Sequence, residues 1–534
     1  PLDDADADAD ADADAASEVV VKEEAEEESL ESSVVERAFV AISESDKFDE
    51  AARAAALGWL SYHSRELKPL WRQQREWLSA PSVELCDDER CVGAAERAGP
   101  GVDPPAGSKK RRKSYPLTFA SGQPTRLADG ARVFLRNDDL EDDEDVVAPS
   151  SEKPYPSRAT LVSIDAERGA AEVLAAEDPP ARCSLVPDEF VNPEPLPTAA
   201  ASNLLHLFGG GDDDADDETA HTRGALADFL ARRPPRLLFP KKKSSSSSKE
   251  EKTATKETAE NDSNNASLES ICEMVEAMDA TTLAVQGPPG TGKTFVAATA
   301  VARLLRQGRK VACAAPSHEA IEQLVAAAVE RLGTTRRDDD DDDDKVLVCK
   351  IGGRSNNNNN NNNNNAKQKK DTDSDTDDDV VNVKRKASLD AKLAAEIKDH
   401  AGAALVGATA WALANPRSAR VYDYLFVDEA GQMPAANVAA MASCARNIVL
   451  VGDQAQLPAP TRGAHPEGGG DSALEYLLGG PLDDDARNGT HVFLAESRRL
   501  RPEICDVVSE LSYAGRLKSH ASSQRRALSL PDTA

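Results

Sequence analysis

The stretch TTLAVQGPPGTGKT, residues 281–294, is the strongest indication of fold class in this chain. Its first part, TTLAVQ, is short and largely apolar, as in a buried β-strand, and GPPGTGKT then fits the pattern G-x-x-x-x-G-K-[ST] at every fixed position. Glycines let the backbone N–H groups of such a loop turn toward phosphate oxygens, and the following helix directs the positive end of its dipole at them. Apolar residues at helical spacing predict that helix, namely Ala297, Val301, Leu304 and Leu305. We therefore expect a strand, a phosphate-binding loop and a helix in direct succession.

Every residue of the loop is a candidate nucleotide ligand: Gly287, Pro288, Pro289, Gly290, Thr291, Gly292, Lys293 and Thr294. The Lys293 ammonium supplies a positive charge for the β- and γ-phosphates, and the Thr294 hydroxyl is a candidate ligand of Mg²⁺. The sequence contains no N-K-x-D tetrapeptide, by which GTPases read guanine, so an adenine nucleotide is favoured. ATP and Mg²⁺ are therefore the expected cofactors.

Two carboxylates follow a second apolar strand in YLFVDEAGQ, residues 424–432. Asp428 is the candidate Mg²⁺ ligand, and Glu429 is placed to orient the attacking water or to accept its proton. Two further apolar strands, VACAA (311–315) and NIVLVG (447–452), also run into polar loops. Because the carboxyl ends of parallel strands meet at one edge of a sheet, we expect a RecA-type core with its functional residues at that edge.

The 534 residues carry a net charge of −31, for which five acidic tracts are responsible. The tracts 1–29, 138–145, 212–218, 338–344 and 371–379 together carry −38, which leaves +7 on the rest of the chain. A mildly basic remainder suits a protein that binds phosphates, whereas the tracts are expected to be disordered and are candidate sites for basic partners. The dispersed cysteines indicate reduced thiols and an intracellular protein. The acidic start and the lack of a long apolar run argue against a secretory signal and a membrane span.

The chain is expected to divide into a disordered acidic arm (1–45), an accessory region (46–240), a linker (241–266), a first RecA-like ATPase domain (267–488) and the truncated start of a second (489–534). In the accessory region, an apolar helical pattern toward residue 79, which Pro69 should kink or end, predicts a helical stalk. Short β-type segments predict a small β-barrel at about 130–191, and residues 80–114 read as a linker. A low-complexity stretch at about 334–388 reads as a surface insertion in the ATPase domain.

A basic run, KKRRK at Lys109–Lys113, closes the expected linker. It is typical either of a nuclear localisation signal or of a solvated run of charges in a linker. The run favours the nucleus slightly over the cytoplasm.

Taken in order, the motifs resemble those of superfamily 1 helicases of class B, which include the nonsense-mediated-decay helicase and the immunoglobulin-mu-binding helicase. The matching segments are QGPPGTGKT (motif I), APSHEAIEQL (Ia), LVGATA (Ic), VDEAGQ (II), GDQAQLPAP (III) and ESRRLRPEICDVVSELSYAGRLKS (IV and the opening of the second RecA-like domain). The region before the ATPase domain resembles the segment that joins a RecB-like nuclease to a helicase in bacterial fusion proteins. The resemblance to the helicases covers roughly half of the chain, from 268 to 520 without the insertion.

This resemblance implies roles that spacing alone does not assign. It implies that Gln456 senses the γ-phosphate, that Arg499 reaches it from the second domain, and that Ser317 and His318 contact the backbone of single-stranded DNA or RNA. It also implies movement from 5′ to 3′. Arg498 stands where the family has an aromatic residue that stacks on adenine, a contact that a guanidinium can also make. Segments resembling motifs V and VI do not occur before the last residue.

Two functions of different classes remain open at this point. The first is an ATP-driven helicase or translocase on single-stranded nucleic acid, and the second is a truncated, non-catalytic module that binds ATP and nucleic acid. A metabolic kinase fits the phosphate loop but leaves GDQAQLP unexplained. The expected fold is α/β, a P-loop NTPase with a RecA-like parallel sheet, an N-terminal helical stalk, a small β-barrel and disordered acidic tracts. Oligomeric state is left open.

Overall fold

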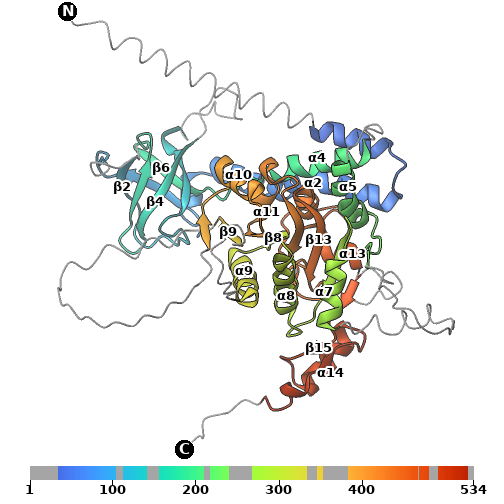
Figure 1. Cartoon of the computed structure of the whole chain (residues 1–534). Coiled ribbons are helices and arrows are strands. Elements are labelled where there is room, and N and C mark those ends of the chain that lie inside the picture. Colours follow the sequence, from blue (N-terminus) through green and yellow to red (C-terminus); the bar gives the residue numbers. More distant parts are fainter. Residues whose placement is uncertain are drawn as a thin grey trace, which may run out of the picture. The chain divides into compact units, whose positions relative to one another are not determined.

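The computed structural model describes residues 34–103, 112–140, 156–209, 217–239, 267–333, 346–352, 383–466, 468–479 and 491–526 (Figure 1). Contacts divide the chain into two compact units, one made of Ser64–Asn192 and the other of Pro1–His63 with Pro193–Ala534. The predicted linker 241–266, most of the acidic tracts and most of the basic run Lys109–Lys113 lie outside the described residues.

An eight-stranded parallel sheet forms the centre of the larger unit, in the order β10-β9-β11-β8-β12-β13-β7-β14 (Figure 1). Its strands are β7 (Thr282–Gln286), β8 (Lys310–Ala314), β9 (Leu347–Ile351), β10 (Lys384–Lys386), β11 (Ala404–Gly407), β12 (Tyr422–Val427), β13 (Ala445–Gly452) and β14 (His491–Phe493). The four strands predicted from sequence are neighbours in this sheet, in the order β8, β12, β13, β7. The prediction of a parallel sheet is therefore confirmed.

Both faces of the sheet are covered by helices, because successive side chains of each strand point to opposite sides. In β7, Leu283 and Val285 enter one hydrophobic cluster and Ala284 enters another. The first cluster includes α7 (Leu268–Glu276), α8 (Lys293–Arg306) and α9 (His318–Leu332). The second includes α4 (Leu196–Phe208), α5 (Asp217–Leu230), α10 (Ala391–Asp399), α11 (Ala410–Leu413), α12 (Ala435–Met441) and α13 (Ala473–Leu478).

The structure places regular elements in two segments that composition assigns to low-complexity sequence, and in a third, α4, for which the sequence analysis makes no prediction. Strand β9 lies within the expected insertion at 334–388, yet all its residues are buried and it pairs with β11 and β10. A helix at 34–44 lies at the end of the expected disordered arm, with Ala38 and Ile42 buried in the core. Helix α4 is likewise a well-buried element of the accessory region. In each case apolar side chains next to a low-complexity tract find a packing partner that is distant in sequence.

The smaller unit contains a closed antiparallel barrel in the order β1-β2-β5-β4-β3-β6. Its strands are β1 (Val92–Arg97), β2 (Lys113–Thr118), β3 (Arg132–Asn137), β4 (Ser157–Asp165), β5 (Ala170–Ala175) and β6 (Arg182–Pro187). Alternate side chains fill the interior, including Tyr115, Leu135, Leu161, Val173 and Leu185. The prediction of a small barrel is confirmed.

The barrel begins earlier than the sequence predicts. Strands β1 and β2 precede the expected range of about 130–191 and fall in or at the end of 80–114, which composition assigns to a linker. The sequence VGAAER of β1 is poor in β-branched and aromatic residues, so local propensity does not identify it as a strand. Pairing with β2 and β6 closes the barrel and makes these residues extended.

Helix α2 (Glu50–Ser79) runs through Pro69 without ending, so the stalk is a single element. Near the end of the described chain, β15 (Glu496–Ser497) and β16 (Lys518–Ser519) form a small parallel pair around α14 (Pro502–Ser512). The remaining short elements are α3 (Ser82–Leu85), η1 (Asp138–Leu140), η3 (Pro416–Ser418), η4 (Ala442–Cys444) and η5 (Ala521–Ser523). Among the helices of the described part of the chain, none is both long and apolar enough to cross a membrane.

Candidate nucleotide-binding site

The phosphate loop lies between the end of β7 and the start of α8, as the sequence predicts. Gly290 and Gly292 have φ angles of +78° and +86°, which favour glycine because a Cβ atom is strained there. The amide of Gly287 donates to the Gly452 carbonyl at 2.9 Å and joins the loop to the end of β13. Lys293 Nζ donates to the Gly287 carbonyl at 3.0 Å, so the ammonium lies against the loop it belongs to.

The loop residue Thr294 and the carboxylate of Asp428 meet at the carboxyl edge of the sheet, where the Thr294 hydroxyl lies 3.3 Å from Asp428 Oδ2. Asp428 is 3% exposed, and burial raises the pKa of its carboxyl above the ordinary value. A hydroxyl and a single carboxylate are oxygen ligands that suit Mg²⁺, which is commonly held by one or two carboxylates together with substrate phosphates. The residues present therefore fit a magnesium–nucleotide site. Among the described residues, no cluster of three or more His, Cys, Asp or Glu offers a site that could hold a metal without a nucleotide.

Glu429 has a strained backbone, with a φ of +52° that L side chains rarely adopt. Strain of this kind costs about 1–3 kcal/mol and persists where the surrounding structure holds it. Here the Ala430 amide donates to the Val451 carbonyl at 2.9 Å and the Gln432 amide donates to the Glu429 carbonyl at 2.8 Å. The half-buried Glu429 side chain therefore follows Asp428 in a fixed direction rather than in the alternation of a regular strand.

Gln456 lies in the polar loop that follows β13. Its Nε2 donates to Asp453 Oδ2 at 2.7 Å, and Asp453 is 3% exposed. Sequence reasoning did not single out Asp453, although it stands in the same GDQAQ segment as Gln456. The buried carboxylate fixes the glutamine side chain at the edge of the sheet.

The segment that carries Arg499 lies directly on the phosphate loop. The Arg498 amide donates to the Gly290 carbonyl at 2.8 Å, and the Ser497 hydroxyl donates to the Pro289 carbonyl at 2.8 Å. A Cβ atom added to Gly290 would lie 2.2 Å from Arg499 Cβ, so the two backbones are in close contact. The Arg499 side chain is exposed beside the loop. Ser497, which is fully buried, was missed because a lone serine carries no sequence signal.

Ser317 and His318 lie at the start of α9 at the same edge of the sheet. The Ser317 side chain caps the helix by accepting from the Ala320 amide at 3.1 Å. Burial and the nearby Lys350 lower the pKa of His318 below its ordinary value, which favours the neutral form of the ring. Lys350, at the end of β9, places Nζ 3.4 Å from His318 Nδ1 and 3.4 Å from Glu322 Oε1. The sequence did not indicate Lys350, since its strand was assigned to an insertion.

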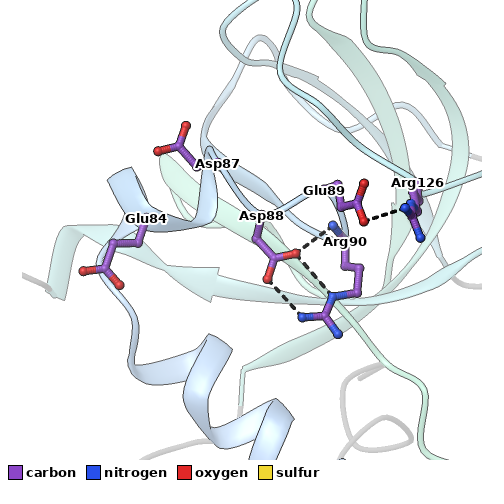
Figure 2. A pocket seen from close by; sticks show the side chains of 6 residues that line it. All are labelled: Glu84, Asp87, Asp88, Glu89, Arg90 and Arg126. Carbon is purple, nitrogen blue, oxygen red and sulfur yellow. Dashed lines mark hydrogen bonds and ion pairs between the residues drawn. The ribbon is translucent and has the colours of Figure 1, made fainter.

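A cavity of about 580 Å³ opens in the smaller unit, near α3 and β1, and is lined by Glu84, Asp87, Asp88, Glu89, Arg90 and Arg126 (Figure 2). Its charges are largely paired, since Arg90 binds Asp88 at 3.3 Å and Arg126 binds Glu89 at 2.6 Å. Asp88 also accepts from the Trp77 indole at 2.8 Å, which lowers the pKa of that carboxyl together with Arg90. Glu84 and Asp87 point away from both ion pairs (Figure 2). None of the predicted site residues lines this open cavity. Its paired charges are typical of a structural ion-pair cluster.

A family model described as an AAA domain matches residues 272–462, which include the phosphate loop, Asp428, Glu429 and Gln456. These residues therefore have the character of a P-loop NTPase domain. No curated protein matches the chain.

The solved structures that align with the chain include three viral helicase structures. An arterivirus nonstructural protein 10 helicase in complex with DNA is 16% identical, with 45% of this chain and 42% of the viral chain covered and a TM-score of 0.25. The crystal structure of an arterivirus nonstructural protein 10 helicase is 13% identical, with 77% and 58% covered and a TM-score of 0.28. The helicase of PRRSV is 17% identical, with 45% and 36% covered and a TM-score of 0.22. The aligned part thus spans less than two thirds of each viral chain, at a similarity too low to assign a function.

Proposed function

We propose that this chain is an ATP-dependent helicase or translocase that couples ATP hydrolysis to movement on single-stranded DNA or RNA. One observation carries the proposal: four polar segments follow or flank neighbouring parallel strands and are joined by hydrogen bonds at one edge of the sheet. Thr294 lies against Asp428, Gly287 is bonded to Gly452, and Arg498 is bonded to Gly290. Hydrolysis of a nucleotide requires groups that bind the phosphates, hold the metal ion and orient water in one place, and this arrangement brings a phosphate loop, carboxylates and a second polar loop together.

In this proposal the phosphate loop binds and orients ATP. The backbone amides and the Lys293 ammonium face the β- and γ-phosphates, and α8 directs its positive end toward them. Thr294 and Asp428 hold the Mg²⁺ ion, which, when bound, neutralises charge on the phosphate oxygens. Burial disfavours the charged form of the Asp428 carboxyl. A divalent cation bound there would compensate the negative charge of the carboxylate.

Glu429 and Gln456 act on the attacking water. Glu429 follows the metal ligand directly and is half-buried, so its carboxylate is placed to orient water or accept its proton. Gln456 offers an amide that is already oriented by Asp453. Arg499, on the segment bonded to the loop, is placed to neutralise charge on the γ-phosphate, a contribution worth roughly 10³–10⁵ in rate.

The nucleic-acid strand is proposed to cross the edge of the sheet at the start of α9. Ser317 and His318 are exposed there, and the helix directs its positive end at this surface. The exposed His318 ring can form a hydrogen bond with a phosphate or sugar oxygen, and the buried Lys350, which is also paired with Glu322, contacts Nδ1 of this ring and positions it. The resemblance to superfamily 1 helicases adds the direction, 5′ to 3′, to this proposal.

The test begins with binding of a fluorescent ATP analogue in the presence of Mg²⁺. Lys293→Ala should abolish tight binding, because it removes the charge that faces the β- and γ-phosphates. Lys310→Ala is a suitable control, since Lys310 is a lysine of the same sheet that donates to the Lys398 carbonyl away from the loop. Equal affinity of the wild type and Lys293→Ala would refute the site.

The second step is ATP hydrolysis with and without single-stranded DNA and RNA, with Lys293→Ala as the blank. Turnover above the blank that rises with a strand supports the proposal and identifies the nucleic acid. Nucleotide binding without turnover under any strand would overturn the enzymatic proposal for this chain in favour of a non-catalytic binding module.

A further inference from the structure

One buried carboxylate joins two segments of the site that are far apart in sequence. Asp453 Oδ2 accepts two hydrogen bonds, from Gln456 Nε2 at 2.7 Å and from the Tyr513 hydroxyl at 2.7 Å. Its other oxygen accepts from the Ala455 amide at 3.2 Å. Asp453 and Tyr513 are 3% and 4% exposed, so these bonds are sheltered from water.

The chemistry of these groups fixes their orientation. A carboxylate only accepts hydrogen bonds, so the phenol must donate and the NH₂ side of the Gln456 amide must face Asp453. Burial and the adjacent Asp453 raise the pKa of Tyr513, so the phenol keeps its proton. One hydrogen of the Gln456 NH₂ group and its carbonyl oxygen then remain for other partners.

Tyr513 and Arg499 belong to the same small body, which is formed by β15, α14 and β16. Tyr513 directly follows α14 and packs in a hydrophobic cluster with Phe493, Cys505 and Leu517. Leu500 and Ala455, the neighbours of Arg499 and Gln456 in sequence, pack against this same cluster. The body is held on the phosphate loop at its other end by Ser497 and Arg498.

We propose that Tyr513 is a positioning residue, which acts through Asp453 to orient the Gln456 amide. Through the same hydrogen bonds, Tyr513 couples Gln456 to the small body that contains α14 and carries Arg499. The inference rests on the proposed function. It assigns a role to a residue that neither the motifs nor the comparisons identify. It also gives the hydrogen bonds through which nucleotide binding would affect α14.

The loss of one hydroxyl tests this link. In Tyr513→Phe the ring still fills its place in the cluster, but Asp453 loses a donor and the Gln456 amide is no longer tied to α14. Tyr424→Phe is the control, because Tyr424 is also 4% exposed and its hydroxyl donates to the Val275 carbonyl of α7 at 3.0 Å rather than to Asp453. Both variants remove one buried hydroxyl, but only one touches the proposed link.

Hydrogen exchange is measured with and without a non-hydrolysable ATP analogue and Mg²⁺. In the wild type and in Tyr424→Phe, peptides of the phosphate loop and of α14 should both exchange several-fold more slowly when the analogue is bound. In Tyr513→Phe the loop should still be protected, whereas α14 should lose this response. Equal protection of α14 in Tyr513→Phe would overturn the inference.

Steady-state kinetics give a second readout. Tyr513→Phe should keep the KM for ATP and lower kcat about tenfold to a hundredfold, the scale expected when a catalytic group is misplaced by about 1 Å. A purely structural role would lower the melting temperature without this split. Asp453→Asn replaces one accepting oxygen by an NH₂ donor, which must face either the Gln456 and Tyr513 donors or the Ala455 amide. It should give the same pattern and serves if Tyr513→Phe does not fold.

The two proposals fail in different ways. If the wild type does not bind the analogue, or binds it as Lys293→Ala does, the proposed function fails. If binding depends on Lys293 but Tyr513→Phe and Asp453→Asn both respond like the wild type, only the inference about Tyr513 fails.

Discussion

The parallel sheet and the closed barrel both bury apolar side chains, but they differ in the direction of neighbouring strands. All paired strands of the sheet run in one direction, so Thr294, Asp428, Asp453 and Gln456 follow strand ends at a single edge. Strands of the barrel alternate in direction, and inward side chains such as Leu161 fill its interior. The sheet therefore concentrates polar groups at one place, whereas the barrel distributes them around a packed core.

The same contrast appears in burial. Strands β7 and β9 are buried along their whole length, while β2 and β4 alternate between buried and exposed residues. Strands inside the sheet are continuous runs of buried residues, since helices cover both faces, whereas β10 at the edge of the sheet is charged and exposed. We infer that changes at the sheet edge alter chemistry more than stability, and that changes inside the barrel do the reverse.

The largest expected effect is at the sheet edge. Glu429→Gln should lower the rate of ATP hydrolysis by about 10²–10⁴-fold, the range for loss of a general base, while ATP affinity is kept. The strained backbone is unchanged, so the melting temperature should stay close to that of the wild type. Steady-state turnover beside a binding titration checks this, and normal hydrolysis would show that water is activated elsewhere.

Asp428→Asn should have the next largest effect and should separate function from stability. Removal of a metal ligand costs several kcal/mol of transition-state stabilisation, so turnover should fall more than about a hundredfold. Burial raises the pKa of Asp428, so its favourable contribution to folding is present below the unfolded pKa and is lost as pH rises through the folded pKa. At pH 7, without nucleotide or metal, the variant should therefore melt at a higher temperature.

Asp423→Asn is the control for that result, because Asp423 lies near the start of β12, whereas Asp428 directly follows the end of this strand. Asp423 accepts from the Lys310 amide at 2.8 Å and pairs with Arg309 at 3.2 Å. Its replacement should lower stability slightly and leave turnover close to the wild-type rate. A rise in melting temperature for both variants would contradict the role of burial at Asp428.

Leu161→Ala should destabilise the barrel by about 2–5 kcal/mol, as expected for truncation of a fully buried leucine. Nucleotide affinity should not change, because Leu161 belongs to the smaller unit and the phosphate loop to the larger. Leu283→Ala, the same truncation in the buried strand β7, should lower both stability and nucleotide affinity. Scanning calorimetry with a binding titration compares the two, and an equal loss of affinity would break the distinction between the regions.

The smallest effect is expected on the outer surface of the sheet unit. Arg303 on α8 pairs with Glu269 on α7 at 2.6 Å, and the Glu269 side chain is 68% exposed. An exposed pair contributes about 0–1 kcal/mol, so Glu269→Gln should change the free energy of unfolding within that range and leave turnover unchanged. Urea unfolding at low and high salt provides the measurement, and a larger loss would show that the pair is part of a stronger network.

Short sequence patterns are sufficient to locate the elements that form the site. The phosphate loop, the strands around it and the carboxylates Asp428 and Glu429 are all placed by short patterns of apolar, glycine and polar residues. Such patterns are reliable because backbone dihedrals and burial on both faces are set by neighbours in sequence. The roles of these residues remain predictions.

Tertiary structure alone decided which distant segments meet. It ordered the strands, brought β9 into the sheet from a low-complexity region, and recruited β1 and β2 to close the barrel. It also placed Tyr513 on Asp453. Pairing across many residues depends on the whole set of packed surfaces, so a single serine, tyrosine or weak strand acquires its place only when the chain is folded.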